Sequence, residues 1–135
     1  MSNFDDAERL LSIAKVYRDE LTRAYEGGHW NVAVRHAQEV VELYLKVTLK
    51  MIGIEYPKSH DIGSVFTRVC IERNLGVDPE ELNKINDISK NLAEKRGPAF
   101  YAERIYIQKD AEKAKADAEF VMNFAESLSK KLRTG

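Results

Sequence analysis

The chain has 135 residues, of which 44% are hydrophobic and 32% are charged, and its formal net charge is −1. This balance is typical of a folded globular protein and excludes an intrinsically disordered chain. A chain so close to neutrality is not a nucleic-acid or membrane binder as a whole, so any basic site must be local. We expect a single domain over residues 1–135.

Cys70 is the one cysteine of the chain, which excludes an intramolecular disulfide and a zinc site built from several thiolates. Its neighbours Val69 and Ile71 are apolar, so we interpret Cys70 as a small buried hydrophobic residue. No apolar run is long enough to cross a membrane, and the N-terminus is acidic, unlike a secretory signal. We therefore expect a cytoplasmic protein without membrane contact, metal or cofactor.

The first two expected helices occupy the first half of the chain. The first helix begins with Asn3 as its cap and ends at Gly27-Gly28. The second begins near His29 or Trp30, ends at Gly53 and carries the strongest pattern in the chain. Its apolar residues recur at helical spacing: Trp30, Ala33, Ala37, Val40, Val41, Tyr44, Leu45, Leu49 and Ile52.

A shorter third helix is expected from Ser59, as its cap, to a point before Gly76. The fourth begins at "DPEEL", where Asp78 is the cap and Pro79 lies in the first turn. It runs into a corner at Gly97-Pro98, because each proline of this chain is interpreted as a break in a helical pattern.

The last helix is expected from about Gln108 to Leu132, with a seam made mostly of alanine against which another helix can pack closely. No segment alternates as a strand does, so the fold class is all-α, an up-and-down bundle of four long helices and one shorter helix. Several apolar residues fall outside the main stripes and suggest a homodimer; the alternative is a second helix surrounded on all sides in a monomer. These residues are Val32, Leu43, Val47, Phe120 and Phe124.

The segment "EKRGPAFYAERIYIQKD", residues 94–110, interrupts the helical pattern with basic and aromatic side chains. A guanidinium can hold a phosphate in a fork, and an aromatic ring can stack on a base. The candidate residues for a nucleotide or RNA site are Arg96, Tyr101, Arg104 and Tyr106. Alternatively, the rings close the end of the bundle and the arginines pair with neighbouring glutamates or helix carbonyls.

A second candidate lies in "YPKSHDIG", where Lys58 and His60 precede an expected helix N-terminus. Such a position attracts anions, and the two side chains would add donors. The alternative is that "SHD" only caps the helix. No phosphate-binding glycine loop, metalloprotease motif or nucleophile elbow occurs, so no catalytic residue is assigned.

The block "GGHWNVAVRHAQEVVELYLKVTLKMIGIEYPKSHDIGSVF" resembles the signature region of the HEPN domain family, and "RGPAFYAERIYI" before a final helix is similar to its prokaryotic members. The resemblance covers about residues 5 to 130. It implies a bundle of four long helices and one shorter helix, a homodimer, and partnership with a minimal nucleotidyltransferase. Some such pairs are toxin–antitoxin systems in which the transferase silences a metal-independent RNase by adding AMP to a tyrosine.

The nuclease members carry an arginine, four to six residues and then a histidine near the start of the final helix. In this sequence Arg96 is followed after four residues by Tyr101, and no histidine follows Arg104. A formal match between Arg23 and His29 lies far along the chain from that position, and we attribute it to chance. We therefore expect a nucleotide- or RNA-binding module; the alternatives are a degenerate RNase toxin and a structural adaptor for the transferase.

Overall fold

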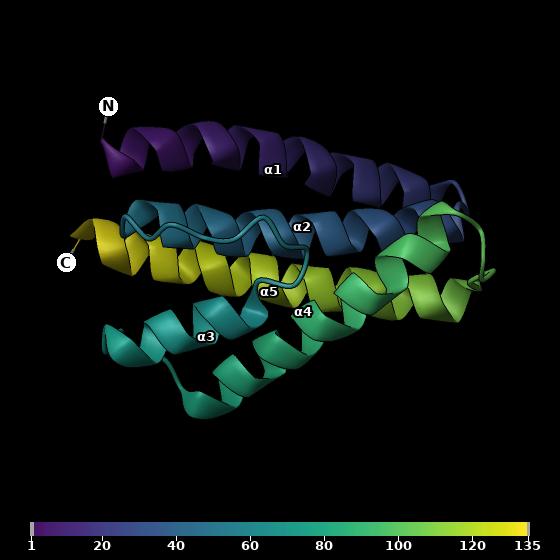
Figure 1. The fold of residues 1–135 in the computed structure, drawn as a ribbon. Coiled ribbons are helices and arrows are strands. Elements are labelled where there is room, and N and C mark those ends of the chain that lie inside the picture. The colour runs from purple at the N-terminus through teal and green to yellow at the C-terminus, as the bar shows by residue number, and fades with distance from the viewer. Residues whose placement is uncertain (1, 135) are drawn as a thin grey trace.

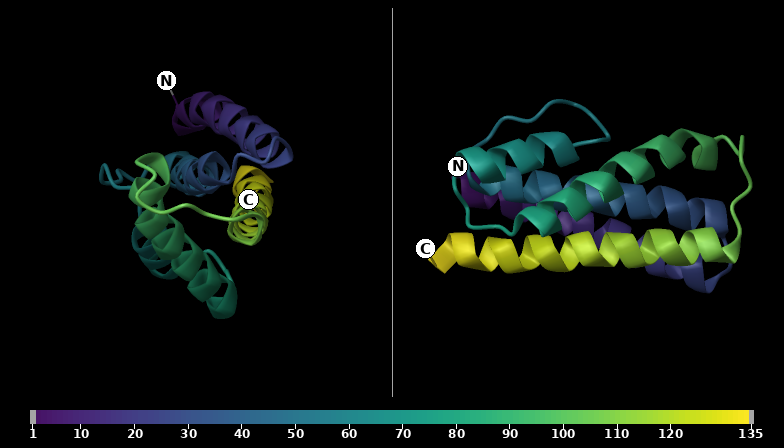
Figure 2. Two further views of the ribbon diagram at one scale, coloured as in Figure 1. Left: turned by 90° about the vertical axis from the view of Figure 1, so that its right-hand side faces the viewer. Right: turned by 90° about the horizontal axis from the view of Figure 1, so that it is seen from below.

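The computed structural model describes residues 2–134, which form five α-helices and no strand in that range. They are α1 (Asn3–Glu26), α2 (Trp30–Met51), α3 (Gly63–Glu72), α4 (Pro79–Phe100) and α5 (Gln108–Thr134). α1, α2 and α5 run side by side, while α4 crosses them obliquely and α3 lies against α4 (Figures 1 and 2). The predicted all-α bundle of four long helices and one short helix is confirmed.

α2 is the central helix and packs against α1, α4 and α5. The predicted alanine seam of α5 is buried, with Ala111, Ala114, Ala118 and Ala125 each at most 2% exposed. These small side chains allow α5 to pack closely against α2. The core therefore has the composition that the apolar stripes of the two helices predicted.

The α1–α2 corner and the α4–α5 corner lie at one end of the bundle, and both termini lie at the other (Figure 1). Gly28 turns the first corner with a φ of 74°, a backbone conformation that favours glycine. Ser2, and not Asn3, caps α1: its hydroxyl accepts a hydrogen bond from the Asp5 amide, and the Asp5 carboxylate accepts one from the Ser2 amide.

α3 begins three residues later than the sequence predicted, because its cap position is Ile62, so the assignment of Ser59 as its cap is wrong. The Ser59 hydroxyl instead accepts a hydrogen bond from the Asp61 amide within the preceding loop, at 3.2 Å. The Gly63 amide donates to the Ser89 hydroxyl of α4 at 3.1 Å. A β-carbon at Gly63 would lie 2.7 Å from that of Ser89, so glycine permits this close approach of α3 and α4.

α4 passes through Pro98 and ends at Phe100, so the prediction of a helix break at Gly97-Pro98 is wrong. A proline removes one amide donor, and so close to the C-terminus it interrupts only the last turn. The predicted start of α4 is confirmed, because the Asp78 carboxylate accepts a hydrogen bond from the Glu80 amide.

Most of the apolar residues that suggested a homodimer are used by the core. Val47 is buried, while Leu43, Phe120 and Phe124 are half-buried and packed against core residues. Only Val32 remains largely exposed, at 45%. These five positions therefore offer no continuous apolar surface for a second subunit.

Cys70 is buried, as predicted, and burial raises the pKa of its thiol to about 11. The thiol is therefore protonated at neutral pH and is a poor nucleophile. Across residues 2–134, no helix combines the length and the apolar character that a membrane span requires.

Candidate functional site

The α4–α5 corner is held in place by a side chain from the first turn of α2. Asn31 Nδ2 donates hydrogen bonds to the Ala99 carbonyl at 3.2 Å and to the Arg104 carbonyl at 2.8 Å. Asn31 Oδ1 accepts one from the Tyr106 amide at 2.8 Å. Backbone groups of a loop need such partners when they leave solvent, so Asn31 fixes the shape of the corner.

Two aromatic rings are exposed at the end of α4. Tyr101 is 71% exposed and Phe100 is 51% exposed, and their rings meet edge to face with centroids 4.8 Å apart. The Arg35 guanidinium of α2 lies 4.3 Å from the Phe100 ring centroid. A cation over a ring at this distance is an attractive contact, and Tyr101 still offers a free face for stacking.

Tyr106 lies in the core, with 3% of its surface exposed, so its ring cannot stack on a ligand. This placement follows the alternative in which an aromatic residue closes the bundle end. Burial raises the pKa of the Tyr106 hydroxyl, and the Arg104 guanidinium partly opposes that rise. Arg104 itself is exposed, and its guanidinium lies 5.2 Å from the Tyr106 ring centroid.

Two arginines near this corner have a buried guanidinium Nε without a hydrogen-bond partner in residues 2–134: Arg35 and Arg96. Arg96 lies one helical turn before Phe100, so both face the same side of α4. Arg35 of α2 contacts Phe100 of α4, so the two arginines lie on two helices that pack together, near this contact. A buried N–H donor without an acceptor is costly, and an oxyanion would supply one.

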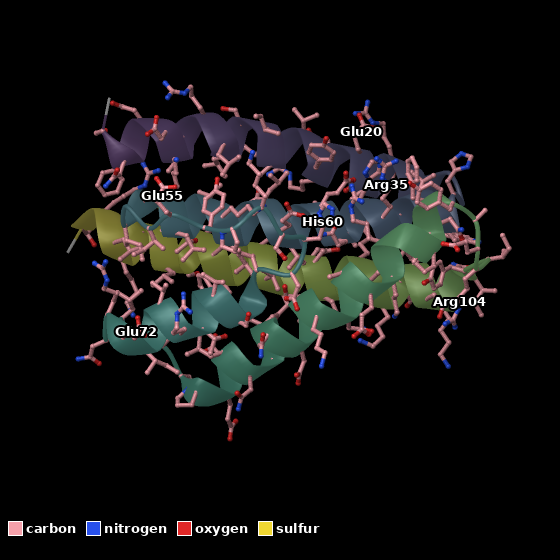
Figure 3. The ribbon with its side chains drawn as sticks, in the orientation of Figure 1. Glu20, Arg35, Glu55, His60, Glu72 and Arg104 are labelled. Carbon is pink, nitrogen blue, oxygen red and sulfur yellow. The ribbon has the colours of Figure 1, made fainter. Side chains whose placement is uncertain are left out.

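The loop between α2 and α3 brings His60 against the middle of α2 (Figure 3). His60 Nδ1 lies 2.8 Å from Glu42 Oε1, and a carboxylate can only accept, so the imidazole donates. Glu42 also accepts hydrogen bonds from Gln38, at 2.9 Å, and from Lys46, at 2.7 Å. The His60 side chain is 54% exposed, which leaves its other nitrogen available to a ligand.

The Glu42 carboxylate is stabilised in its charged form. Burial raises the pKa of Glu42, but the hydrogen bonds from Lys46, Gln38 and His60 outweigh that effect, and the pKa is lowered. Gln38 Nε2 also donates to the His60 carbonyl at 3.1 Å, so α2 holds this residue by its backbone as well. The loop is therefore positioned by two residues of α2.

The structure separates the predicted site residues into two groups. Arg96, Tyr101 and Arg104 lie at the corner, whereas Lys58 and His60 lie in the loop that crosses α2. In Figure 3, Arg104 is at the corner and His60 is farther along α2. One polar stripe of α2 runs between the groups, with residues at spacings of three and four: Arg35, Gln38, Glu39, Glu42 and Lys46.

Sequence reasoning missed Asn31, Arg35 and Glu42, whose partners are distant in the chain. Asn31 and its acceptors are 68 and 73 residues apart, and Glu42 is 18 residues from His60. One signal was present, because the polar residues of the second helix recur on one face opposite its apolar stripe. Within residues 2–134 no group of three or more acidic, histidine or cysteine side chains could hold a metal ion.

The comparisons with known proteins identify a family. A family model described as the HEPN domain matches residues 7–128, which is nearly the whole chain. No curated protein and no solved structure matches this sequence. The five-helix bundle has the architecture that the resemblance implied, and the match extends over all of the candidate residues. This chain belongs to the HEPN domain family.

Proposed function

We propose that this HEPN protein is a cytoplasmic homodimer that binds a nucleotide or single-stranded RNA at the α4–α5 corner. One observation carries the proposal: within residues 2–134, Arg35 and Arg96 each have a buried Nε without a hydrogen-bond partner, and the Arg35 guanidinium lies on the exposed ring of Phe100, next to that of Tyr101. Arginine forks hold phosphate oxygens and aromatic rings stack on bases, so the corner combines both kinds of contact that such a ligand needs.

The two groups of candidate residues then have different roles. Arg96 and Arg104 contact phosphate at the corner, while Tyr101 stacks on the base. Lys58 and His60 contact a second phosphate group farther along α2, so they matter for RNA of several nucleotides and little for a mononucleotide. The Asn31 hydrogen bonds keep the corner in place before the ligand arrives.

Titration of ATP and of a short single-stranded RNA tests the proposal. Arg96→Gln is expected to weaken both affinities about tenfold or more, because a charge-assisted hydrogen bond to phosphate is lost. Tyr101→Ala is expected to weaken them about fivefold or more through lost stacking. Arg68→Gln, at an exposed position of α3, is the matched control. Equal affinity of Arg96→Gln and Arg68→Gln would exclude this site.

The homodimer is proposed to form beside the binding surface. Ile105 and Ile107 are 73% and 61% exposed in the same corner, which is unusual for side chains of this size. Ile105→Asp with Ile107→Asp is expected to convert dimers to monomers in light scattering after gel filtration. A wild-type chain that is monomeric at high concentration would reject the dimer without affecting the ligand proposal.

A second candidate function is RNA cleavage by a degenerate site, and the pairing of Glu42 with His60 favours it. A carboxylate that orients an imidazole is a common arrangement for general acid–base catalysis. In this role His60 transfers a proton at the scissile phosphate, and Arg96 holds another phosphate of the same RNA at the corner. Growth arrest on expression that is removed by His60→Gln and by Arg96→Gln supports cleavage, whereas harmless expression with intact bulk RNA contradicts it.

A third role is docking of a minimal nucleotidyltransferase, with or without transfer of AMP. Tyr101 is the one exposed tyrosine in residues 2–134, so it is the tyrosine that such an enzyme could reach. A small nucleotidyltransferase gene next to this one would support the partnership. Incubation of the pair with ATP is then expected to add the mass of AMP to wild type and not to Tyr101→Phe.

A further inference from the structure

A groove lies away from the α4–α5 corner, between α1, α2 and α5 and toward the end of the bundle that holds the two termini. α1 and α5 both pack on α2 and make few contacts with each other, so a groove remains between them. Its volume is about 510 Å³, within the usual range for small-molecule sites. The lining residues come from all three helices: Glu8, Leu11, Lys15, Arg18, Tyr44, Val47, Ala125, Glu126, Ser129, Lys130 and Arg133.

The floor of this groove is apolar except for one phenol. Leu11, Val47 and Ala125 supply hydrocarbon surface from three different helices. Tyr44 is 1% exposed, and within residues 2–134 no acceptor lies within hydrogen-bond distance of its hydroxyl. A hydrogen bond from the Arg18 guanidinium, which can only donate, acts on the pKa of this hydroxyl. Buried tyrosine hydroxyls ordinarily have a partner, so a ligand acceptor is the missing element here.

The Tyr44 hydroxyl is a donor at neutral pH. Burial and the nearby Glu126 carboxylate raise the pKa of Tyr44, and the Arg18 guanidinium opposes this rise without reversing it. Because the hydroxyl is buried and Arg18 lines the same groove, we expect a ligand to reach it by displacing the Arg18 side chain. Arg18 is 38% exposed and its ion pair with Asp19 is long, at 3.3 Å, so this movement costs little.

The rim of the groove carries a surplus of positive charge. Four basic and two acidic side chains line the groove, a formal surplus of two positive charges in a chain whose net charge is −1. Arg133 pairs with Glu8 across the groove. Lys15 and Lys130 take part in no ion pair among the described residues, so their ammonium groups are available to an anion.

We propose that this groove binds a small amphipathic oxyanion, an apolar body that carries a carboxylate or a phosphate. The apolar body lies on Leu11, Val47 and Ala125, and an oxygen of the ligand accepts the Tyr44 hydroxyl. The charged group lies at the rim between Lys15, Arg18 and Lys130. The site is independent of the α4–α5 corner, with which it shares no residue.

The test uses the full chain and four probes followed by amide NMR shifts. They are 2-naphthoate, 1-naphthyl phosphate, the neutral 2-naphthalenemethanol and inorganic phosphate. Each probe is added at about 5 mM, several times the millimolar dissociation constant expected for such a ligand. One or both naphthyl anions are expected to shift the amide signals near Val47 and Ala125. Which anion binds more tightly identifies a carboxylate or a phosphate as the charged group.

Variants link the shifts to the groove. Tyr44→Phe is expected to weaken binding about two- to tenfold, the range for one hydrogen bond, while it leaves thermal stability equal or higher because an unpaired hydroxyl is removed. Lys15→Gln and Lys130→Gln are each expected to weaken binding by a smaller factor. Lys90→Gln, on the exposed side of α4, is the matched control.

Four outcomes overturn the proposal. They are equal binding of the neutral alcohol, equal binding of inorganic phosphate, shifts confined to the α4–α5 corner, and no shift with either naphthyl anion. Unchanged affinity in Tyr44→Phe would overturn the assignment as well, and that variant is expected to fold because it alters one oxygen atom. Shifts at the corner alone would support ligand binding there and still overturn the groove, so the two proposals can fail separately.

Discussion

The two sides of α2 are stabilised in different ways. Toward α1 and α5 it presents buried apolar side chains such as Val40 and Val47, which are at most 3% exposed. Toward α4 and the α2–α3 loop it presents a polar stripe in which Asn31 and Glu42 hold distant segments by hydrogen bonds. The stability of the first side depends on how well apolar side chains fit together. The stability of the second side depends on a few hydrogen bonds, some of them between charged groups.

The difference has a consequence for where function can reside. Close-packed apolar side chains offer no hydrogen bond to a ligand, and in the groove between α1 and α5 the polar group that α2 contributes is the Tyr44 hydroxyl. Within residues 2–134, the polar side contains two buried arginine Nε donors without a partner, exposed rings and an oriented imidazole, and the candidate residues other than the buried Tyr106 lie on or beside it. Substitutions should therefore affect the two sides by different amounts and with a different dependence on pH.

The largest effect is expected in the apolar core, from Leu45→Ala. Leu45 is fully buried, and removal of its side chain loses transfer free energy and leaves a cavity. The free energy of unfolding should fall by about 2–5 kcal/mol, measured by urea denaturation. Leu43→Ala, at a half-buried position of the same helix, should lose clearly less. Equal losses would mean that the core side of α2 is not as closely packed as described.

On the polar side, Asn31→Ala is expected to give the next largest effect. It removes three hydrogen bonds and leaves the Tyr106 amide and two carbonyls without a partner. The expected loss is about 1–3 kcal/mol. Hydrogen exchange should show earlier opening of the 99–106 segment, with the rest of α4 still protected. Asn123→Ala, on the exposed side of α5, should change stability by less than about 0.5 kcal/mol.

These two substitutions also mark what the sequence could predict. Leu45 belongs to a stripe whose period of 3.6 is visible in the sequence, so its burial followed from the pattern. The stripes likewise predicted the number, order and approximate bounds of the helices. The role of Asn31 depends on a contact with residues at least 68 positions away, and nothing local distinguishes it from Asn83 or Asn91.

The candidate site was predictable only where its residues are close in sequence. Arg96, Tyr101 and Arg104 lie within nine positions, and the structure places them at one corner. Tyr106 lies in the same segment but turns into the core, since burial of one ring closes the bundle end. Ser59 and Pro98 show that local signals for helix ends can be outweighed by contacts with another helix or by nearness to the last turn.

A smaller effect, with a defined pH dependence, is expected from Glu42→Gln. The pKa of Glu42 is lowered in the folded state, so its charged form stabilises the fold above its unfolded pKa, and this contribution is lost as the pH falls through the folded pKa. The free energy of unfolding of wild type should exceed that of the variant by about 1–2 kcal/mol at pH 7, and this difference should disappear in acid.

Its matched control is Glu119→Gln, which removes an exposed pair with Lys115. This substitution should change the free energy of unfolding by less than about 0.5 kcal/mol at every pH. A Glu42→Gln difference that persists unchanged into acid would mean that the shape of the side chain, and not its charge, holds the loop. The polar side of α2 would then resemble the apolar side.

The smallest effect is expected from Thr48→Val. Thr48 is fully buried among apolar residues, but its hydroxyl bonds the Tyr44 carbonyl one turn earlier on the same helix, at 3.3 Å. The Tyr44 carbonyl already accepts a hydrogen bond from a helix amide, so loss of the Thr48 hydroxyl leaves no polar group without a partner. Valine has a similar volume and adds apolar contact, so the free energy of unfolding should change by less than about 0.5 kcal/mol, independently of pH. A loss of stability as large as that of Asn31→Ala would contradict the difference drawn between the two sides of α2. A hydrogen bond within one helix would then stabilise the fold as much as one that joins distant segments.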